Sequence, residues 1–337
     1  MSRLEISEPE MAMSDRPLPI NRRAIPDPAC ESMWLTEDGA PIRRIDWPGA
    51  PRDGEGLRRG SILFLPGRAD FYEKYLETLD GWHRQGWRVT ALDWRWQAGS
   101  GRFRADPKVG DVADFSIWIN DLASFWRDWT ELVPGPHVLV GHSMGGHLVL
   151  RTVAEGLVRP DALVLSAPML GFVTAVPEWL QLTYAGLMCR LGDPGRMAWT
   201  GGERPGEDAD QRARDLTHDP ARYADELWWR SHRPQLDLGP ASWHWVRKAC
   251  ESLRRLATPD LLESVNVPVL LLAARHDALV SLVAIERAAA RLPDAELCAF
   301  GEEAAHEILR ECDAVRERVL ATIADFLDRK APRSLTR

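Results

Sequence analysis

The sequence has no hydrophobic run long enough to cross a membrane and no cluster of basic residues. None of its apolar stretches approaches the roughly 18 consecutive residues that a membrane-spanning helix requires. Its 42 Lys and Arg against 50 Asp and Glu give a formal net charge of −8 at pH 7. A negative chain without a Lys/Arg run lacks the basic surface that binds nucleic acid. We therefore exclude a spanning protein and expect no nucleic acid as a partner.

Cysteine is scarce, and its spacing excludes the usual cysteine-based sites. The five cysteines form neither a Cys-x-x-Cys pair nor a Cys/His cluster, which predicts neither a disulfide framework nor a zinc site. Cys298 and Cys312 stand in apolar surroundings, and we expect both to be buried thiols. The first residues, MSRLEISEPEMAM, lack the apolar stretch of a secretory signal. We expect a cytoplasmic protein, with peripheral contact at the inner membrane face as an open alternative.

The pattern along the chain predicts an α/β core interrupted by one insertion. Residues 1–29 contain five prolines and little apolar periodicity, which indicates an extension that is partly disordered. Residues 30–170 and 257–337 alternate short apolar runs with helical spacing, which predicts a mainly parallel twisted sheet with helices on both faces. The expected strands are a hairpin at 33–36 and 42–47, and runs at 61–65, 88–93, 137–140, 161–166, 267–273 and 295–300. The expected core helices lie near 71–85, 115–132 and 147–157.

The insertion, residues 171–256, shows no clear buried strand. It carries 12 Lys and Arg and 12 Asp and Glu, so its formal charge is zero and the rest of the chain carries the whole −8. Amphipathic pieces separated by glycine-rich loops predict a mostly helical unit between two strands of the sheet.

A candidate nucleophile lies between an apolar strand and a helix. The segment Gly141-His-Ser-Met-Gly145 fits G-x-S-x-G, a pattern that alone is weak. Its position directly after a buried strand is the setting that a nucleophilic serine requires, because small flanking residues allow the sharp turn that exposes the hydroxyl. We expect Ser143 to be the nucleophile; the alternative is an ordinary glycine-rich turn.

A serine hydroxyl needs a base to remove its proton and an acid to orient that base. On a sheet of this kind the partners follow later strands, in the order serine, acid, histidine. Asp277 and His306 occupy those places. His276 would precede the last strand, and His142 and His147 flank the serine, so we expect these three to have other roles.

The developing oxyanion also needs backbone donors. The N–H of Met144, directly after the serine, should be one donor, and the loop after an early strand should supply the other from Arg68. The Arg68 side chain either contacts a polar or anionic substrate group or is an ordinary solvated arginine.

Four segments together resemble the monoacylglycerol lipase/lysophospholipase group of the α/β-hydrolase superfamily, the hydrolases of serine aminopeptidase S33 type. They are Pro66-Gly-Arg-Ala-Asp-Phe-Tyr-Glu-Lys-Tyr75, Asp93-Trp-Arg-Trp-Gln-Ala-Gly-Ser100, Gly141-His-Ser-Met-Gly-Gly146 and His306-Glu-Ile-Leu-Arg-Glu311. The resemblance implies that residues 171–256 form a helical cap over the serine. Two positions depart from the family pattern: Pro66-Gly67 replaces the common His-Gly, and Trp96 replaces a glycine, which we expect to narrow the substrate range.

These observations favour a serine carboxylic-ester hydrolase that acts on a monoacyl lipid-like ester through an acyl-enzyme, without a metal or organic cofactor. An aminopeptidase, thioesterase or acyltransferase with the same three residues is the alternative, because a fold and a triad do not fix the leaving group. Glu207, Asp208 and Asp210 would suit the amine of a peptidase substrate, although a run this polar is more often a solvated loop. A non-catalytic binding protein is a third interpretation.

Tryptophan is abundant where the other aromatics are few, with 15 Trp against eight Phe and four Tyr. We expect eight indoles near the ester pocket: Trp94, Trp96, Trp179, Trp199, Trp228, Trp229, Trp243 and Trp245. We expect the remaining seven to be explained by packing: Trp34, Trp47, Trp82, Trp87, Trp118, Trp126 and Trp129. A cap rich in indoles and without net charge would also suit transient contact with a membrane surface. The alternative is that the same indoles line a buried pocket.

Overall fold

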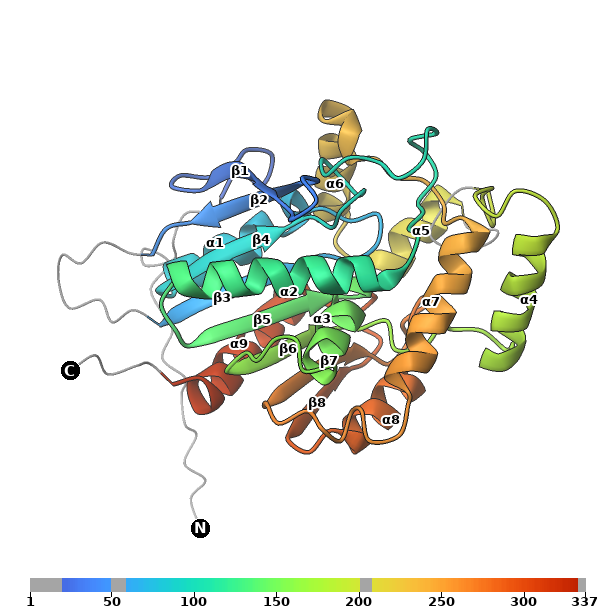
Figure 1. The fold of residues 1–337 in the computed structure, drawn as a ribbon. Helices are drawn as coiled ribbons and strands as arrows, with labels where there is room; N and C mark the ends of the chain where they lie inside the picture. The colour runs from blue at the N-terminus through green and yellow to red at the C-terminus, as the bar shows by residue number, and fades with distance from the viewer. Residues whose placement is uncertain (1–19, 50–58, 201–207, 333–337) are drawn as a thin grey trace, which may run out of the picture.

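The computed structural model describes residues 20–49, 59–200 and 208–332, and within them the chain builds one eight-stranded sheet (Figure 1). The strands are β1 (Cys30–Leu35), β2 (Pro41–Trp47), β3 (Gly60–Leu65), β4 (Trp87–Leu92), β5 (His137–His142), β6 (Ala162–Ser166), β7 (Val269–Ala274) and β8 (Ala295–Phe300). Their order across the sheet is β1-β2-β4-β3-β5-β6-β7-β8. The pairings β1–β2 and β2–β4 are antiparallel, and the other five are parallel.

Helices cover both faces of this sheet. Those of the core are α1 (Leu76–Arg84), α2 (Phe115–Leu132), α3 (Met144–Ala154), α8 (Leu282–Arg291) and α9 (Asp313–Lys330). In Figure 1, α2 and α3 lie on the face toward the viewer, and α1 and α9 lie behind the sheet. The predicted arrangement of a mainly parallel sheet with helices on both faces is therefore confirmed.

The central strands are apolar because neither of their faces meets water. Every residue of β3, β6 and β7 is buried, as expected of parallel strands between two helical layers. Their registers align the ends: Leu65 of β3 pairs with Gly141 of β5, which in turn pairs with Leu165 of β6. The loops that follow these three strands therefore start side by side, at one edge of the sheet.

The core helices differ in detail from the sequence expectation. The helix expected at 71–85 is a 3-10 turn, η2 (Tyr72–Tyr75), followed by α1. The helix expected from residue 147 begins three residues earlier, directly after Ser143. The first turn of this helix is rich in glycine, so it lacks the regularly spaced apolar residues by which a helix is predicted from sequence.

The described residues of the insertion form four helices: α4 (Glu178–Arg190), α5 (Ala209–Leu216), α6 (Pro220–His232) and α7 (Trp243–Leu256), with a short turn η3 (Pro234–Leu236). Among its described residues it has isolated bridges but no named strand. Helix α4 packs on α7 at the outer side of the molecule (Figure 1), whereas α6 lies against η2 of the core. None of the helices in the described ranges has the length and apolar character needed to cross a membrane.

Most indoles expected to pack do so. Six of the seven are buried, and Trp34 is half-buried against the ring of Phe125. The expectation for the cysteines is wrong in part: Cys298 is half-buried and Cys312 is exposed, because Cys312 begins the last helix at the surface. The buried thiol is that of Cys250, and none of the five cysteines, all of which lie in the described residues, forms a disulfide.

The burial of β5 predicts a large loss of stability on truncation. Leu139 is fully buried, and Leu139→Ala should lower the free energy of unfolding by about 3 kcal/mol, because the lost contacts leave a cavity. Leu132→Ala is the control, since Leu132 is 73% exposed and its truncation should change stability by no more than about 0.5 kcal/mol. Urea denaturation measures both; equal losses would contradict the assigned core.

Candidate active site

Ser143 lies on a tight turn between β5 and α3. Its φ of 51° and ψ of −119° fall in a region that L-residues rarely adopt. Two hydrogen bonds hold the turn in place: the Ser143 N–H donates to Ser166 O at 3.0 Å, and the Ser143 carbonyl accepts from the Met169 N–H at 2.9 Å. A Cβ on Gly145 would lie 2.3 Å from Pro66 O, so only glycine permits this close approach of helix and loop. The sequence G-x-S-x-G is therefore explained by sterics at this position.

Three predicted residues meet at the edge of the sheet. His306 Nε2 lies 2.9 Å from Ser143 Oγ, and His306 Nδ1 lies 2.7 Å from Asp277 Oδ2. The other oxygen of Asp277 accepts the N–H groups of Leu279 and Val280 at 2.8 and 3.0 Å. Asp277 follows β7, and His306 follows β8 on a loop that leads into the turn η4 (Ile308–Arg310).

The environment of Asp277 keeps the carboxylate ionised. Burial alone would raise its pKa, but the His306 imidazole and the two backbone N–H groups hold the pKa below its ordinary value. A charged carboxylate at Nδ1 fixes the histidine tautomer with the proton on Nδ1 and leaves Nε2 as the acceptor for the serine hydroxyl.

The loop after β3 lies across from the serine and is held from several sides. Gly67 N–H donates to Asp70 Oδ2 at 3.1 Å, and Ala69 N–H donates to Gln97 Oε1 at 2.7 Å. The indole of Trp94 donates to Pro66 O at 2.8 Å. These contacts fix the backbone on both sides of Arg68. Across from this loop, Met144 is the first residue of α3, where backbone N–H groups have no partner within the helix.

Ser143 opens into a mainly apolar cavity of about 250 Å³. Its wall includes the side chains of Met169, Phe172, Val173, Trp199, Trp245 and Val280. A smaller and more polar cavity of about 50 Å³ lies on another side of the serine and is lined by residues that include Asp70, Lys74 and His306. The site is therefore two-sided, with an apolar space and a charged one adjoining the same hydroxyl.

The comparison with known families decides the class. The family described as serine aminopeptidase, S33, matches residues 56–313. The chain belongs to this family. The predicted recognition is thereby confirmed, and so is the hydrolase class.

Several known proteins resemble the chain over most of its length. Lysophospholipase L2 of Escherichia coli strain K12 is 32% identical over 314 residues, which cover 89% of this chain and 87% of that protein. A probable lysophospholipase L2 of Haemophilus influenzae is 27% identical, with 81% and 85% covered. A soluble variant of monoglyceride lipase from Saccharomyces cerevisiae, solved with a substrate analog, has the same fold. Its TM-score is 0.71 at 18% identity, with 94% of this chain and 99% of that chain covered.

The other histidines near the serine of this S33 family member do not bond to it. The ring of His142 packs against that of His306, with centroids 4.9 Å apart, and its Nδ1 lies 3.2 Å from Ser166 O. His147 Nε2 lies 2.6 Å from Ser252 Oγ. His276 is exposed and lies 4.0 Å from Glu302. Burial and the neighbouring His306 lower the pKa of His142 to about 4, so its ring is neutral at pH 7.

Several expectations about the surroundings of the site need correction. Trp96 packs on Phe103 and under Arg95, and it is absent from the described lining of the large cavity, so it does not narrow that cavity. Of the eight indoles expected near the pocket, Trp199 and Trp245 line it. The sequence could not show which indoles would line the cavity, because the number of tryptophans in the insertion says nothing about the face on which each one lies.

The expected acidic cluster also has a structural explanation. Asp208 caps α5 by accepting the Gln211 N–H at 2.7 Å, and Asp210 is exposed on the first turn of that helix. Glu207 lies outside the described residues. Within the described part of the chain, no group of three or more His, Cys, Asp and Glu side chains is arranged to hold a metal ion.

The Arg68 side chain is neither solvated nor simply free for substrate. It donates to Gly239 O at 2.6 Å and lies over the Trp245 ring, 5.2 Å from its centroid. It nevertheless contributes to the walls of both cavities at Ser143. The sequence analysis expected Trp94 near the pocket but missed its hydrogen bond to the loop, and it missed Gln97, for which a place in the Asp93 segment was the only signal.

The buried histidines predict a pH dependence of stability. Burial, aided by Arg151, lowers the pKa of His147 from 6.5 to about 3. Below pH 6.5 the unfolded chain takes up a proton that the folded chain refuses, so this part of the stability is lost as the pH falls from 6.5 through about 3. His147→Gln removes this group. The free energy of unfolding should then depend less steeply on pH between 4 and 6, and the slope should correspond to about one fewer proton taken up on unfolding.

The control for this prediction is His276→Gln, because the His276 ring is exposed and its replacement should leave the slope unchanged. Urea denaturation at several pH values gives the slopes of both variants. A wild-type slope in His147→Gln would contradict the assignment.

Proposed function

We propose that the protein is a serine ester hydrolase that removes the acyl group from a lipid with one acyl chain. The observation that carries this proposal is the hydrogen-bonded series Asp277–His306–Ser143, whose serine opens into a mainly apolar cavity. Ser143 is the nucleophile, His306 the general base and acid, and Asp277 the group that orients the imidazole and stabilises its charge.

In the first half of the reaction, Ser143 Oγ attacks the ester carbonyl carbon while its proton passes to His306 Nε2. The negative charge that develops on the carbonyl oxygen is stabilised by the backbone N–H groups of Met144 and Arg68. The C–O bond to the alcohol then breaks, and His306 returns the proton to the leaving oxygen. In the second half, water loses a proton to His306 and attacks the acyl-enzyme, which releases the acid and restores the serine.

The two cavities support the choice of a lipid ester. Apolar side chains such as Met169, Phe172 and Trp199 suit an acyl chain, while the polar cavity suits the alcohol part of the ester. The names of two similar proteins also support a substrate with one acyl chain, because lysophospholipase and monoglyceride lipase both refer to lipids with a single acyl chain. Arg68 borders both cavities, so its guanidinium places a positive charge beside the serine that suits an anionic head group.

The family description favours a second candidate, an aminopeptidase with the same three residues. Such an enzyme needs an acidic group for the free amine of its substrate. Asp208 is already used as a helix cap, and the large cavity is lined mainly by apolar side chains. The ester hydrolase is therefore the stronger proposal, with amide, thioester and acyl transfer as outcomes of the test.

Substitution of the nucleophile tests the mechanism. Ser143→Ala should lower the turnover of p-nitrophenyl esters and lysophospholipids by about 10⁴-fold or more, because the acyl-enzyme cannot form. Ser124→Ala is the control and should keep wild-type activity, because Ser124 is half-buried on α2 and its hydroxyl donates to Glu37 Oε1 at 3.1 Å. Activity undiminished in Ser143→Ala would refute the mechanism.

The same substrate panel includes an aminoacyl amide and an acyl thioester, each measured with and without an added alcohol as acyl acceptor. Faster cleavage of the amide than of the esters would favour the peptidase. A preference for the thioester, or a transfer product, would favour the other two alternatives.

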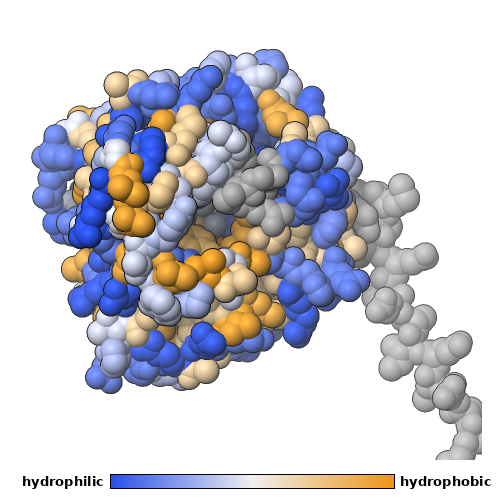
Figure 2. All heavy atoms as spheres, turned by 90° about the vertical axis from the view of Figure 1, so that its right-hand side faces the viewer, coloured by the Kyte–Doolittle hydropathy of each residue, from blue (hydrophilic) through white to orange (hydrophobic). Residues whose placement is uncertain are grey.

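We also propose that α4 contacts a membrane surface transiently while the lipid enters. This helix exposes large apolar side chains, among them Trp179 (67%), Tyr184 and Leu187 (48%). Figure 2, which looks onto this side of the molecule, shows apolar side chains gathered on the face. Gln181 of the same helix lines the large cavity, so the apolar surface adjoins the way to the serine. The five cysteines form no disulfide in the described structure, which is consistent with a reducing compartment and supports a cytoplasmic location.

Vesicle sedimentation tests the contact with a membrane. Replacing Trp179 and Leu187 together by serine should lower the bound fraction on phosphatidylethanolamine/phosphatidylglycerol vesicles, because both apolar side chains leave the interface. Leu132→Ser is the matched control: Leu132 ends α2 at the opposite edge of the sheet and is 73% exposed. Equal binding by all three proteins would refute this role of α4.

A further inference from the structure

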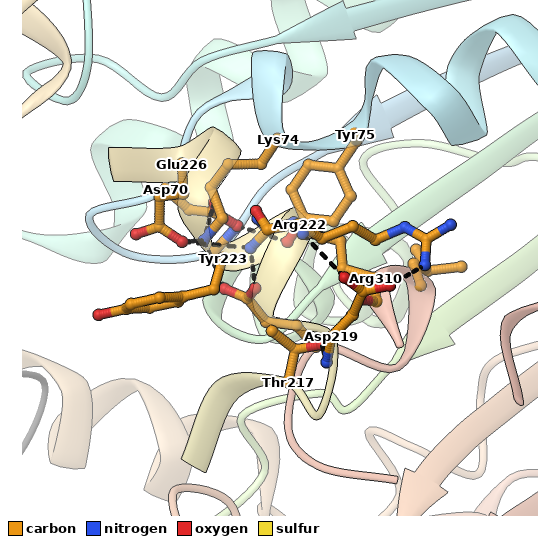
Figure 3. A network of polar contacts seen from close by, with 12 residues as sticks. Asp70, Lys74, Tyr75, Thr217, Asp219, Arg222, Tyr223, Glu226 and Arg310 are labelled. Atoms are coloured by element: carbon orange, nitrogen blue, oxygen red, sulfur yellow. Dashed lines mark hydrogen bonds and ion pairs between the residues drawn. The ribbon is translucent and has the colours of Figure 1, made fainter. Parts of the chain in front are cut away.

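A cluster of buried charges joins the insertion to the two loops that flank the serine. The buried ion cluster consists of Asp70, Lys74, Glu226, Glu307 and Arg310, each with a side chain no more than 5% exposed. Lys74 Nζ lies 2.9 Å from Asp70 Oδ1 and 3.1 Å from Glu226 Oε2, and it also pairs with Glu307. Arg310 pairs with Glu307 and lies 3.1 Å from Glu226 Oε2. Figure 3 labels Asp70, Lys74, Glu226 and Arg310, which come together from separate parts of the chain.

The buried ion cluster joins three parts of the molecule: the segment after β3, the His306 segment and the insertion. Asp70 ends the loop after β3, and its Oδ2 accepts the Gly67 N–H and the Tyr75 hydroxyl, so it fixes the loop that carries Arg68. Glu307 is the residue directly after His306, and Arg310 lies on the turn η4 that follows. Glu226 lies on α6, in the insertion. Through Lys74 and Arg310, one carboxylate of the insertion therefore contacts both loops.

Backbone contacts reinforce this attachment. His306 N–H donates to Asp215 O at 3.2 Å, and Glu307 N–H donates to Leu216 O at 2.8 Å, both at the last turn of α5. The Thr217 hydroxyl donates to Arg310 O at 2.8 Å. The segment that holds the histidine therefore has backbone partners in the insertion, and it is not positioned by β8 alone.

Four cations surround the single negative charge of Glu226. Its Oε1 accepts from Arg212 at 2.9 Å and from Arg230 at 3.1 Å, while its Oε2 faces Lys74 and Arg310. Burial alone would raise the pKa of Glu226, but these four cations lower it well below its ordinary value. Removal of one partner leaves buried charges without compensation, which is strongly unfavourable.

We propose that Glu226 is a positioning residue for the reaction: through Lys74 and Arg310 it holds the His306 loop and the loop of Arg68 in the geometry needed for acylation. The inference rests on the proposed function, because it assigns a role in the acylation of Ser143. A purely structural carboxylate would affect how many molecules fold, whereas a positioning carboxylate affects how fast each folded site reacts.

Active-site titration separates these two effects. Glu226→Gln keeps the shape of the side chain and removes its charge. With an excess of fluorophosphonate, the amplitude of labelling counts folded sites, and the rate constant reports the alignment of serine, histidine and oxyanion donors. We expect the rate constant per site to fall by about tenfold to a hundredfold, the size of effect that small misplacements produce. For a short p-nitrophenyl ester, kcat should fall likewise while KM changes by less than about threefold, since the apolar cavity is untouched.

The matched control is Asp121→Asn. Asp121 on α2 is a buried carboxylate bonded to Arg95 at 2.6 and 2.7 Å, so its replacement also removes one buried negative charge. It should lower the thermal midpoint and the number of active sites, with a rate constant per site within about twofold of wild type. Glu226→Asp retains the charge but shortens the side chain, and it should fall between wild type and Glu226→Gln.

The outcomes distinguish the inference from the proposed function. Equal rate constants per site in wild type, Glu226→Gln and Glu226→Asp would overturn the positioning role. A wild-type protein that reacts with fluorophosphonate but cleaves no lipid ester would refute the proposed substrate and leave the positioning role to be decided by the same rate constants. A wild-type protein that does not react at Ser143 would overturn both.

Discussion

The structure depends on three parallel strands that end at the same edge of the sheet. β3, β5 and β6 are in register at Leu65, Gly141 and Leu165, and this alignment puts the loop of Arg68 directly beside the turn of Ser143. The approach is so close that the carbonyl of Pro66 occupies the space where any side chain on Gly145 would begin. A hydroxyl held on a strained turn beside the Arg68 loop follows from this packing, and the segments after β7 and β8 bring Asp277 and His306 to it.

How much the sequence could predict depends on whether a feature is local. The strand runs, the turn at Ser143 and the places of Asp277 and His306 all have local signals, because buried parallel strands are apolar throughout and their loops follow in a fixed order. The glycine-rich start of α3 was missed, since glycine hides helical spacing. The bracing by Trp94 and Gln97 was hinted at only by their position in a motif, because a hydrogen bond between two loops leaves no periodic trace.

Features that join distant segments had no local signal at all. Lys74 and Glu226 are separated by more than a hundred residues in the sequence, and each looks like an ordinary surface charge there. The zero net charge of the insertion suggested an electrically indifferent cap. In the structure, its arginines pair with core carboxylates: Arg222 with Glu77, and Arg233 with Glu73. The zero net charge of the insertion therefore does not mean that its charges are idle. They form ion pairs with the core, and these pairs become visible only in the fold.

The backbone contacts between the end of α5 and the histidine loop have a consequence for how such proteins diversify. The insertion is continuous in sequence, yet α5 and α6 are bonded to the His306 segment while α4 packs outward on α7. Recombination that exchanged the insertion as one cassette would also exchange the partners of the His306 segment. Exchange of α4 alone would leave those partners in place, and the new helix would have to fit the face of α7 on which α4 packs.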